Sequence, residues 1–341
     1  MERAEQVAEF MFAEQLRLAD VFGGGDGAGF RAHPWERPGL GGGRACIIED
    51  GEVFERAGIN VSLVHGTRVP PTIAKSRPHA AGLPYAATGI SLVLHPRNPY
   101  VPAFHANFRY FEITGADWWF GGGCDLTPAY GFDEDAIGFH QALKTWGDRH
   151  DAAWYPAWKT SCDEYFTIAH RGEMRGIGGV FFDYLSDSAA AGFDRCWRAI
   201  ADGVATIVPA YLPILERRRA MPYGERQRAW QLFRRGRYVE FNLVYDRGTR
   251  FGLETRGNSE AILMSLPPLA RWGFDIRPEP DSPEMDLARF LQPRDWARPL
   301  LPLRQDAVDG VGYRLGQRRP REHLPGNPQA DRSVQDLPEK H

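Results

Sequence analysis

Residues 88–125 read TGISLVLHPRNPYVPAFHANFRYFEITGADWWFGGGCD, and this stretch decides the fold that we predict. In the segment 104–112 the even positions are mostly aromatic or small, whereas His105, Asn107 and Arg109 occupy odd positions. Side chains alternate across a strand, so these three polar groups share one face. The pattern therefore predicts a strand with one apolar face and one polar face.

The same alternation precedes this segment, and a glycine run follows it. Ser91 and His95 lie on one parity of the preceding strand, and the three prolines of residues 96–102 favour a turn between the two strands. A third strand is expected to run into the triple glycine 121–123, where absent Cβ atoms allow a sharp bend, with Asp125 just past it. Polar stripes on sheets are mostly just solvated. Two histidines, an arginine among aromatic residues and an acid beside three glycines favour a functional site over a merely solvated face.

The composition of the whole chain is that of a soluble globular protein. Its 341 residues are 43% hydrophobic and 25% charged, with a net charge of -3, which implies no bulk attraction to nucleic acid or to an anionic membrane. The N-terminus lacks the continuous apolar core of a signal peptide, and no segment is long and apolar enough to span a membrane. Four cysteines without CxxC or zinc spacing suggest reduced thiols. We expect a cytoplasmic protein.

Arginine dominates the basic residues, of which only four in 41 are lysine. Nucleotide bias in a GC-rich genome is the simpler explanation. The functional explanation is that a guanidinium fork matches a carboxylate bidentately, so an enzyme acting on a multiply carboxylated substrate would use some of these arginines.

Apolar spacing predicts further elements on both sides of this stretch, and no internal repeat or linker separates them. Residues 33–38 and 67–87 are expected to be loops, and 318–341 have little to bury and should be disordered. We therefore predict one domain. Helices are predicted over 3–21, 133–146, 155–171, 193–219 and 225–235, and strands over 45–48, 53–54, 57–66, 175–183, 238–245 and 250–255.

Four long strings carry a resemblance to a known family. They are ATGISLVLHPRNPYVPAFHANFRYFE, WWFGGGCDLTPAYGF, DEYFTIAHRGEMRGIGGVFFDYL and GRYVEFNLVYDRGTRFGLET. With these strings the chain resembles the oxygen-dependent coproporphyrinogen III oxidases of haem biosynthesis. The likeness runs from about residue 7 to about residue 300.

The resemblance implies a fold and a reaction. The fold is α+β, a large flat antiparallel sheet covered by helices on both faces, in a homodimer with a catalytic domain over 1–300 and a C-terminal extension over 301–341. The reaction is oxidative decarboxylation of two propionates of coproporphyrinogen III to vinyl groups, giving protoporphyrinogen IX. Molecular oxygen is the electron acceptor, and no organic cofactor is implied.

The resemblance also implies roles for individual residues. His105 matches the proton donor, and Asp125 would accept hydrogen bonds from the pyrrole N–H groups, although an aspartate at a turn is often only a cap. Arg109 would bind a propionate, unless it forms a cross-strand ion pair. Arg175, and with it Arg171, is a further candidate for carboxylate binding. Substrate contacts are also implied at Ser91, Asn107, Phe108, Arg256, Gly257 and Asn258.

Three points of the sequence leave alternatives open. Some bacterial relatives bind a divalent metal at four histidines that match His95, His105, His140 and His170, but these lie on two predicted strands and two predicted helices, so spacing shows no site. Asn258 stands where those relatives have an arginine, and Tyr184 stands where many have an aspartate. The alternatives are a tetrapyrrole-binding protein without turnover and a metal-dependent oxygenase of another carboxylated substrate.

Overall fold

The structure is a computed structural model that describes residues 2–187, 192–254 and 257–298. The chain divides into two units, Met1–Pro299 and Leu300–His341, and the described residues all lie in the first. The second unit lies outside the described residues, as do the predicted extension over 301–341 and its expected disorder from residue 318.

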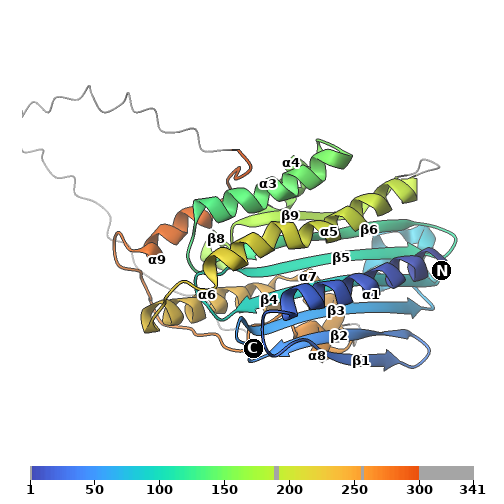
Figure 1. The fold of residues 1–341 in the computed structure, drawn as a ribbon. Coiled ribbons are helices and arrows are strands. Elements are labelled where there is room, and N and C mark those ends of the chain that lie inside the picture. The colour runs from blue at the N-terminus through green and yellow to red at the C-terminus, as the bar shows by residue number, and fades with distance from the viewer. Residues whose placement is uncertain (1, 188–191, 255–256, 299–341) are drawn as a thin grey trace, which may run out of the picture. The chain divides into compact units, whose positions relative to one another are not determined.

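A seven-stranded antiparallel sheet forms the centre of the first unit. Its strands are β1 (Arg31–Arg37), β2 (Gly41–Glu49), β3 (Phe54–Gly66), β4 (Tyr85–Pro96), β5 (Ala103–Ile113), β6 (Trp118–Thr127) and β9 (Gly178–Leu185), and they lie side by side in that order (Figure 1). A small second sheet pairs β7 (Thr167–Ile168) with β8 (Glu173–Met174). Together with the helices, the large sheet confirms the predicted α+β class.

The three strands expected over 88–125 are present, with the predicted alternation. In β5 the even-numbered side chains are buried, and His105, Asn107 and Arg109 are half-buried. The register pairs Ser91 with Asn107 and His105 with Asp125, so the polar side chains of β4, β5 and β6 lie on one face. We call this the polar face.

Helices pack on both faces of the sheet. They are α1 (Glu2–Gly23), α2 (Pro71–Ser76), α3 (Asp133–His150), α4 (Trp154–Tyr165), α5 (Gly192–Arg218), α6 (Glu225–Val244), α7 (Arg247–Glu254), α8 (Ser259–Leu263) and α9 (Pro283–Asp286), with 3₁₀ turns η1 (Pro78–Ala80), η2 (Ala169–Arg171) and η3 (Leu287–Phe290). Figure 1 shows α1 and α5 in front of the strands. Gly203 of α5 lies against Phe108 on the apolar face, whereas Tyr238 of α6 packs on His95, with ring centroids 5.0 Å apart, on the polar face.

Contrary to the expectation that no segment is long and apolar enough, helix α5 has the length and composition of a membrane-crossing helix, alone among the described residues. Its residues pack against the sheet, and 56% of its most apolar window is buried inside the structure. Pro209 and Pro213 lie within it without splitting it. It is therefore the core helix of this fold.

Two predicted strands are wrong, because residues 238–245 belong to α6 and its end and 250–255 overlap α7. The alternation that suggested a strand covers only eight residues. On the helix, Tyr238, Phe241 and Asn242 are spaced i, i+3 and i+4, and all three are buried against the polar face.

Other boundaries differ for local reasons. Residues 33–38, predicted as a loop, lie mostly in β1, an edge strand that tolerates Pro34 because its free edge needs no N–H donor. The predicted loop 67–87 contains α2, η1 and the start of β4, and the helix predicted to end at 171 stops at Tyr165.

The triple glycine 121–123 does not form a bend. It continues β6, which pairs with β5 on one side and with β9 on the other. Close strand approach explains the glycines, because a Cβ at Gly122 would lie 2.4 Å from Asn107 O and one at Gly123 would lie 2.1 Å from Val180 O. The irregularity is a shift of register against β9 near Phe120.

Candidate active site

The polar face is covered at both ends and half-exposed between them. At one end, Phe111 and Trp119 form an apolar cluster with the segment that carries α2 and η1. At the other end, Phe166 and Phe241 form a second cluster beside His105. The side chains of Ser91, Asn107 and Arg109, which lie between the two clusters, are half-buried. This middle part is where a ligand can reach the sheet.

A chain of charged groups lies at the end of this face that Phe166 and Phe241 cover. His105 Nδ1 lies 2.9 Å from Asp125 Oδ1, and Arg175 Nη2 donates to both oxygens of Asp125 at 2.8 Å. Arg175 Nη1 donates to Asn242 Oδ1 of α6 at 2.7 Å. The antiparallel register places His105 directly opposite Asp125, so the contact follows from the pairing of β5 with β6.

Aromatic rings enclose the guanidinium of Arg175. Its Cζ lies 4.3 Å from the ring centroid of Phe166, 4.5 Å from that of Tyr238 and 4.9 Å from that of Phe241. Cation–π attraction is strongest where the cation is desolvated, and Arg175 is only 2% exposed. The arginine therefore belongs to the core. The sequence had suggested that it binds a substrate carboxylate, but its guanidinium is not free to do so.

The environment of Asp125 keeps it ionised. Burial alone would raise the pKa of this carboxyl group, but the charge of Arg175 and the hydrogen bond from His105 hold the pKa below its ordinary value. A carboxylate only accepts hydrogen bonds, so the proton of the imidazole lies on Nδ1 of His105. Nε2 makes no hydrogen bond within the described residues and is available to accept or return a proton.

Arg109 lies further along the polar face. Its Nη1 donates to Asn107 Oδ1 at 3.1 Å, and its Nη2 lies 3.1 Å from Asp183 Oδ2 of β9. The cross-strand ion pair that the sequence left open as an alternative is therefore present, formed across β6. His105 and Arg109 are four residues apart on one strand, or about 13 Å at the usual rise per residue.

The remaining implied substrate contacts divide into three groups. Ser91 is half-buried on the polar face opposite Asn107. The side chain of Phe108 faces the other way, into the apolar core, so only its backbone borders the polar face. Asn258 caps α8, accepting from Ala261 N at 3.1 Å, and Gly257 precedes it. Arg256 lies outside the described residues.

The four histidines of the possible metal site do not come together. His140 is fully buried between Tyr155 OH and Ile177 O, at 3.0 Å from each. His170 lies in η2 and contacts Tyr245 OH and Glu240. Among the described residues, no group of three or more histidine, cysteine or acidic side chains could hold a metal ion. The donors therefore do not fit one shared ion.

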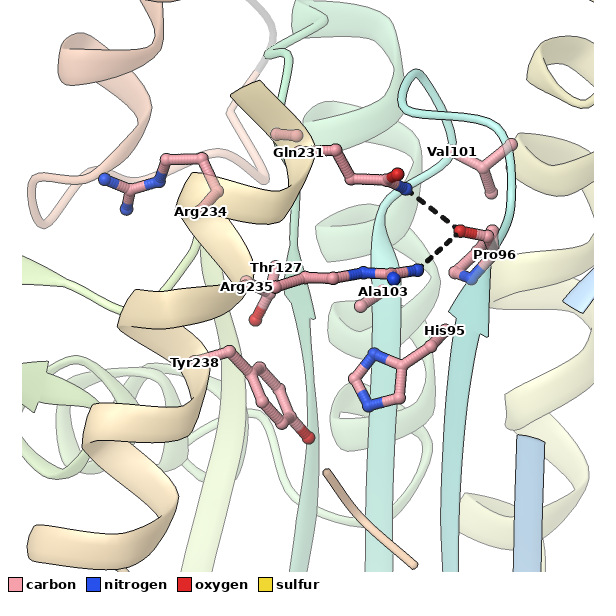
Figure 2. A pocket seen from close by; sticks show the side chains of 10 residues that line it. His95, Pro96, Val101, Ala103, Thr127, Gln231, Arg234, Arg235 and Tyr238 are labelled. Atoms are coloured by element: carbon pink, nitrogen blue, oxygen red, sulfur yellow. Dashed lines mark hydrogen bonds between the residues drawn. The ribbon is translucent and has the colours of Figure 1, made fainter. Parts of the chain in front are cut away.

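His95 lies on the polar face beside a small cavity. The cavity holds about 20 Å³, enough for about one water molecule, and Arg235, Gln231 and Thr127 are among the residues around it (Figure 2). His95 Nε2 donates to Ser265 O at 2.9 Å, so Nδ1 is left as an acceptor. Burial and the nearby Arg235 lower the pKa of His95 to about 3, which keeps the ring neutral.

Three residues of the site were missed by the sequence reasoning. Asn242 was assigned to a strand, although it holds Arg175 from α6. Asp246 was taken as a turn residue. Burial would raise the pKa of its carboxyl group, but hydrogen bonds from Thr249 and from Tyr165 OH, the latter at 2.7 Å, hold that pKa below its ordinary value. Asp183 follows the apolar run of β9, and no signal in the sequence linked it to Arg109.

Comparison with protein families gives a match over most of the chain. The sequence model of a family described as Coproporphyrinogen III oxidase matches residues 6–296. The match covers the whole sheet, the polar face and the segment around Asp246.

Proposed function

We propose, because the chain belongs to the coproporphyrinogen III oxidase family of haem biosynthesis, that it catalyses the oxygen-dependent decarboxylation of two propionates of coproporphyrinogen III. The product is protoporphyrinogen IX, with vinyl groups in place of those propionates. Molecular oxygen is the co-substrate, and no organic cofactor takes part.

One observation carries the proposal, namely that the oriented imidazole of His105 and the guanidinium of Arg109 share one half-exposed face. The substrate has an electron-rich ring of pyrroles and four carboxylates at its rim. A base facing the ring and a cation holding a rim carboxylate match these two features. The separation of about 13 Å along β5 suits one group at the ring and the other at a side chain.

The chemistry of each turnover balances with oxygen alone. The side chain –CH₂–CH₂–COOH loses carbon dioxide and two hydrogens. The C–C bond to the carboxyl carbon breaks as carbon dioxide leaves, its electron pair forms the double bond between the two remaining carbons, and the carbon next to the pyrrole gives up one hydrogen with the two electrons that oxygen accepts. Oxygen accepts two electrons and two protons and leaves as hydrogen peroxide. His105 Nε2 takes or returns the proton at the pyrrole, since Nδ1 is held by Asp125.

Asp125 has a different role from the one that the sequence suggested. It is 1% exposed, and both of its oxygens already accept hydrogen bonds from Arg175. A pyrrole N–H therefore does not reach it. We assign Asp125 as a positioning residue that fixes the tautomer and the orientation of His105.

We also propose a cytoplasmic homodimer. Large apolar side chains are exposed on the last turn of α6, on α7 and on the segment after α8, and we take them as the surface that contacts a second copy of the chain. All four cysteines are free and buried, which fits a reducing compartment. The exposed side chains are Leu243, Val244, Leu253, Leu269, Trp272, Phe274 and Ile276.

The test is incubation of the full chain with coproporphyrinogen III in air and under anaerobic conditions, with product chromatography. We expect the divinyl product only in air, and a large loss of rate in His105→Asn with substrate binding retained. Binding without any vinyl product in the wild type would identify a non-catalytic tetrapyrrole-binding protein. A parallel reaction with a chelator separates the metal-dependent alternative, because there activity would disappear and return with added metal.

A further inference from the structure

Asp183 places a negative charge beside Arg109 that the proposed reaction does not use. The two side chains come from β9 and β5, with β6 between them, and Arg109 Nη2 lies 3.1 Å from Asp183 Oδ2. They meet above Gly121. A Cβ at that position would come within 2.7 Å of Asp183 Oδ1 and 2.8 Å of Arg109 Nη2, so glycine is what lets the pair form across the strand.

The backbone next to Asp183 is held in an uncommon conformation. Tyr184 has φ 55, in the left-handed region that side chains other than glycine rarely adopt, and its N–H donates to Asp183 Oδ1 at 3.0 Å. The Cζ of Arg77 lies 4.7 Å from the ring of Tyr184 and 4.4 Å from the ring of Trp119. These contacts fix the Asp183 carboxylate at the edge of the polar face.

The ion pair itself is open to a competitor. The side chain of Arg109 is 38% exposed and that of Asp183 is 26% exposed, and pairs this accessible contribute little to stability. Asn107 accepts one N–H group from Nη1 of Arg109, and Asp183 contacts Nη2, so each terminal nitrogen keeps a second N–H group for a ligand. A carboxylate of a ligand can therefore share Arg109, and any second carboxylate beside it approaches Asp183.

We propose that Asp183 is a specificity-determining residue that limits this end of the site to pyrroles carrying one carboxylate. This inference rests on the proposed function. A pyrrole with a propionate and a methyl group presents a single carboxylate to Arg109, and its methyl group is indifferent to Asp183. A pyrrole with a propionate and an acetate presents two, and Asp183 repels the second.

The size of the effect follows from the exposure of the site. Two negative charges about 6 Å apart in a largely aqueous environment repel each other enough to weaken binding about threefold to tenfold. Removing the charge of Asp183 should therefore favour the ligand with more carboxylates, and the change should shrink as salt is added.

The experiment uses two stable oxidised porphyrins as probes, coproporphyrin III with four carboxylates and uroporphyrin III with eight. Their dissociation constants are measured by fluorescence for the wild type, Asp183→Asn and the control Asp148→Asn. Asp148 is a comparably exposed acid on α3, paired with Lys144 and away from the polar face. We expect Asp183→Asn to tighten the binding of uroporphyrin about threefold to tenfold more than that of coproporphyrin, and the control to leave the ratio of the two dissociation constants unchanged.

Two results would overturn the inference. One is an unchanged ratio of the two dissociation constants in Asp183→Asn. The other is loss of affinity for both porphyrins, which would mean that Asp183 only positions Arg109. The proposed function fails separately, if the wild type gives no vinyl product from coproporphyrinogen III. Circular dichroism of each variant shows whether it has folded.

Discussion

Replacing Asp125 by asparagine tests the role of the buried charged chain most directly. Asparagine keeps the shape of the side chain but removes the negative charge, so Arg175, which is 2% exposed, loses its counter-ion. Breaking a buried ion pair from one side costs about 3–5 kcal/mol of the free energy of unfolding. Asn242 and the three aromatic rings still contact the guanidinium, so we expect the lower part of that range.

The measurement is urea unfolding followed by circular dichroism, for the single variant and for the double variant Asp125→Asn with Arg175→Met. The double variant removes both charges, and a methionine can fill the space among the rings. We expect it to recover most of the lost stability, because no unpaired buried charge is left. It should stay inactive, since His105 lacks the carboxylate that orients it.

A loss of less than about 1 kcal/mol in Asp125→Asn would refute the role of a buried ion pair, since a loss that small is typical of an exposed pair. That role would also be refuted if the double variant were less stable than the single one. Normal turnover in a folded Asp125→Asn protein would sink the role given to the carboxylate in positioning His105.

Three further predictions follow from other parts of the structure. Arg109→Lys should raise the Michaelis constant more than it lowers the turnover number, because the ammonium group of lysine lacks the planar fork with which a guanidinium binds a carboxylate through two parallel hydrogen bonds; equal values to the wild type would contradict this. Gly121→Ala should change the free energy of unfolding by no more than about 1 kcal/mol from the wild type, because the added Cβ meets only the ends of the flexible side chains of Asp183 and Arg109. Because it displaces Arg109, the variant should bind substrate more weakly. Unfolding of the variant would contradict this prediction. Burial, with the nearby Lys159, lowers the pKa of His140 to about 3, so between pH 6.5 and 3 the unfolded chain binds a proton that the folded chain does not. The free energy of unfolding therefore falls as the pH falls through this range. His140→Gln should flatten this part of the curve of stability against pH, and an unchanged slope would disprove the assignment.

The strands of the site could be predicted from the sequence because a period of two is a local signal. His105, Asn107 and Arg109 had to share a face, and the structure has them so. The pairing of His105 with Asp125 depends on the register between two strands, which the spacing of polar residues alone does not set. The resemblance to a family supplied those two residues together, without their contact.

Arg175 shows why the rest of the site could not be predicted. An arginine beside a glycine-rich run looks like a surface group, and its burial depends on the ring of Phe166 and on two rings of α6, those of Tyr238 and Phe241, which lie far from it in the sequence. The helix that brings two of these rings was partly mistaken for a strand. The burial of Asp125 followed from the same contacts and was equally hidden.

The uninterrupted path of β5 has a consequence for how this protein can change in length. Because the imidazole, the amide and the guanidinium of the polar face all sit on odd positions of one strand, inserting or deleting a single residue within Ala103–Ile113 would turn every polar side chain beyond it into the apolar interior and expose the aromatic ones. Natural variation in length should therefore be confined to the connections between strands, such as residues 97–102, where one residue more or less leaves both faces intact.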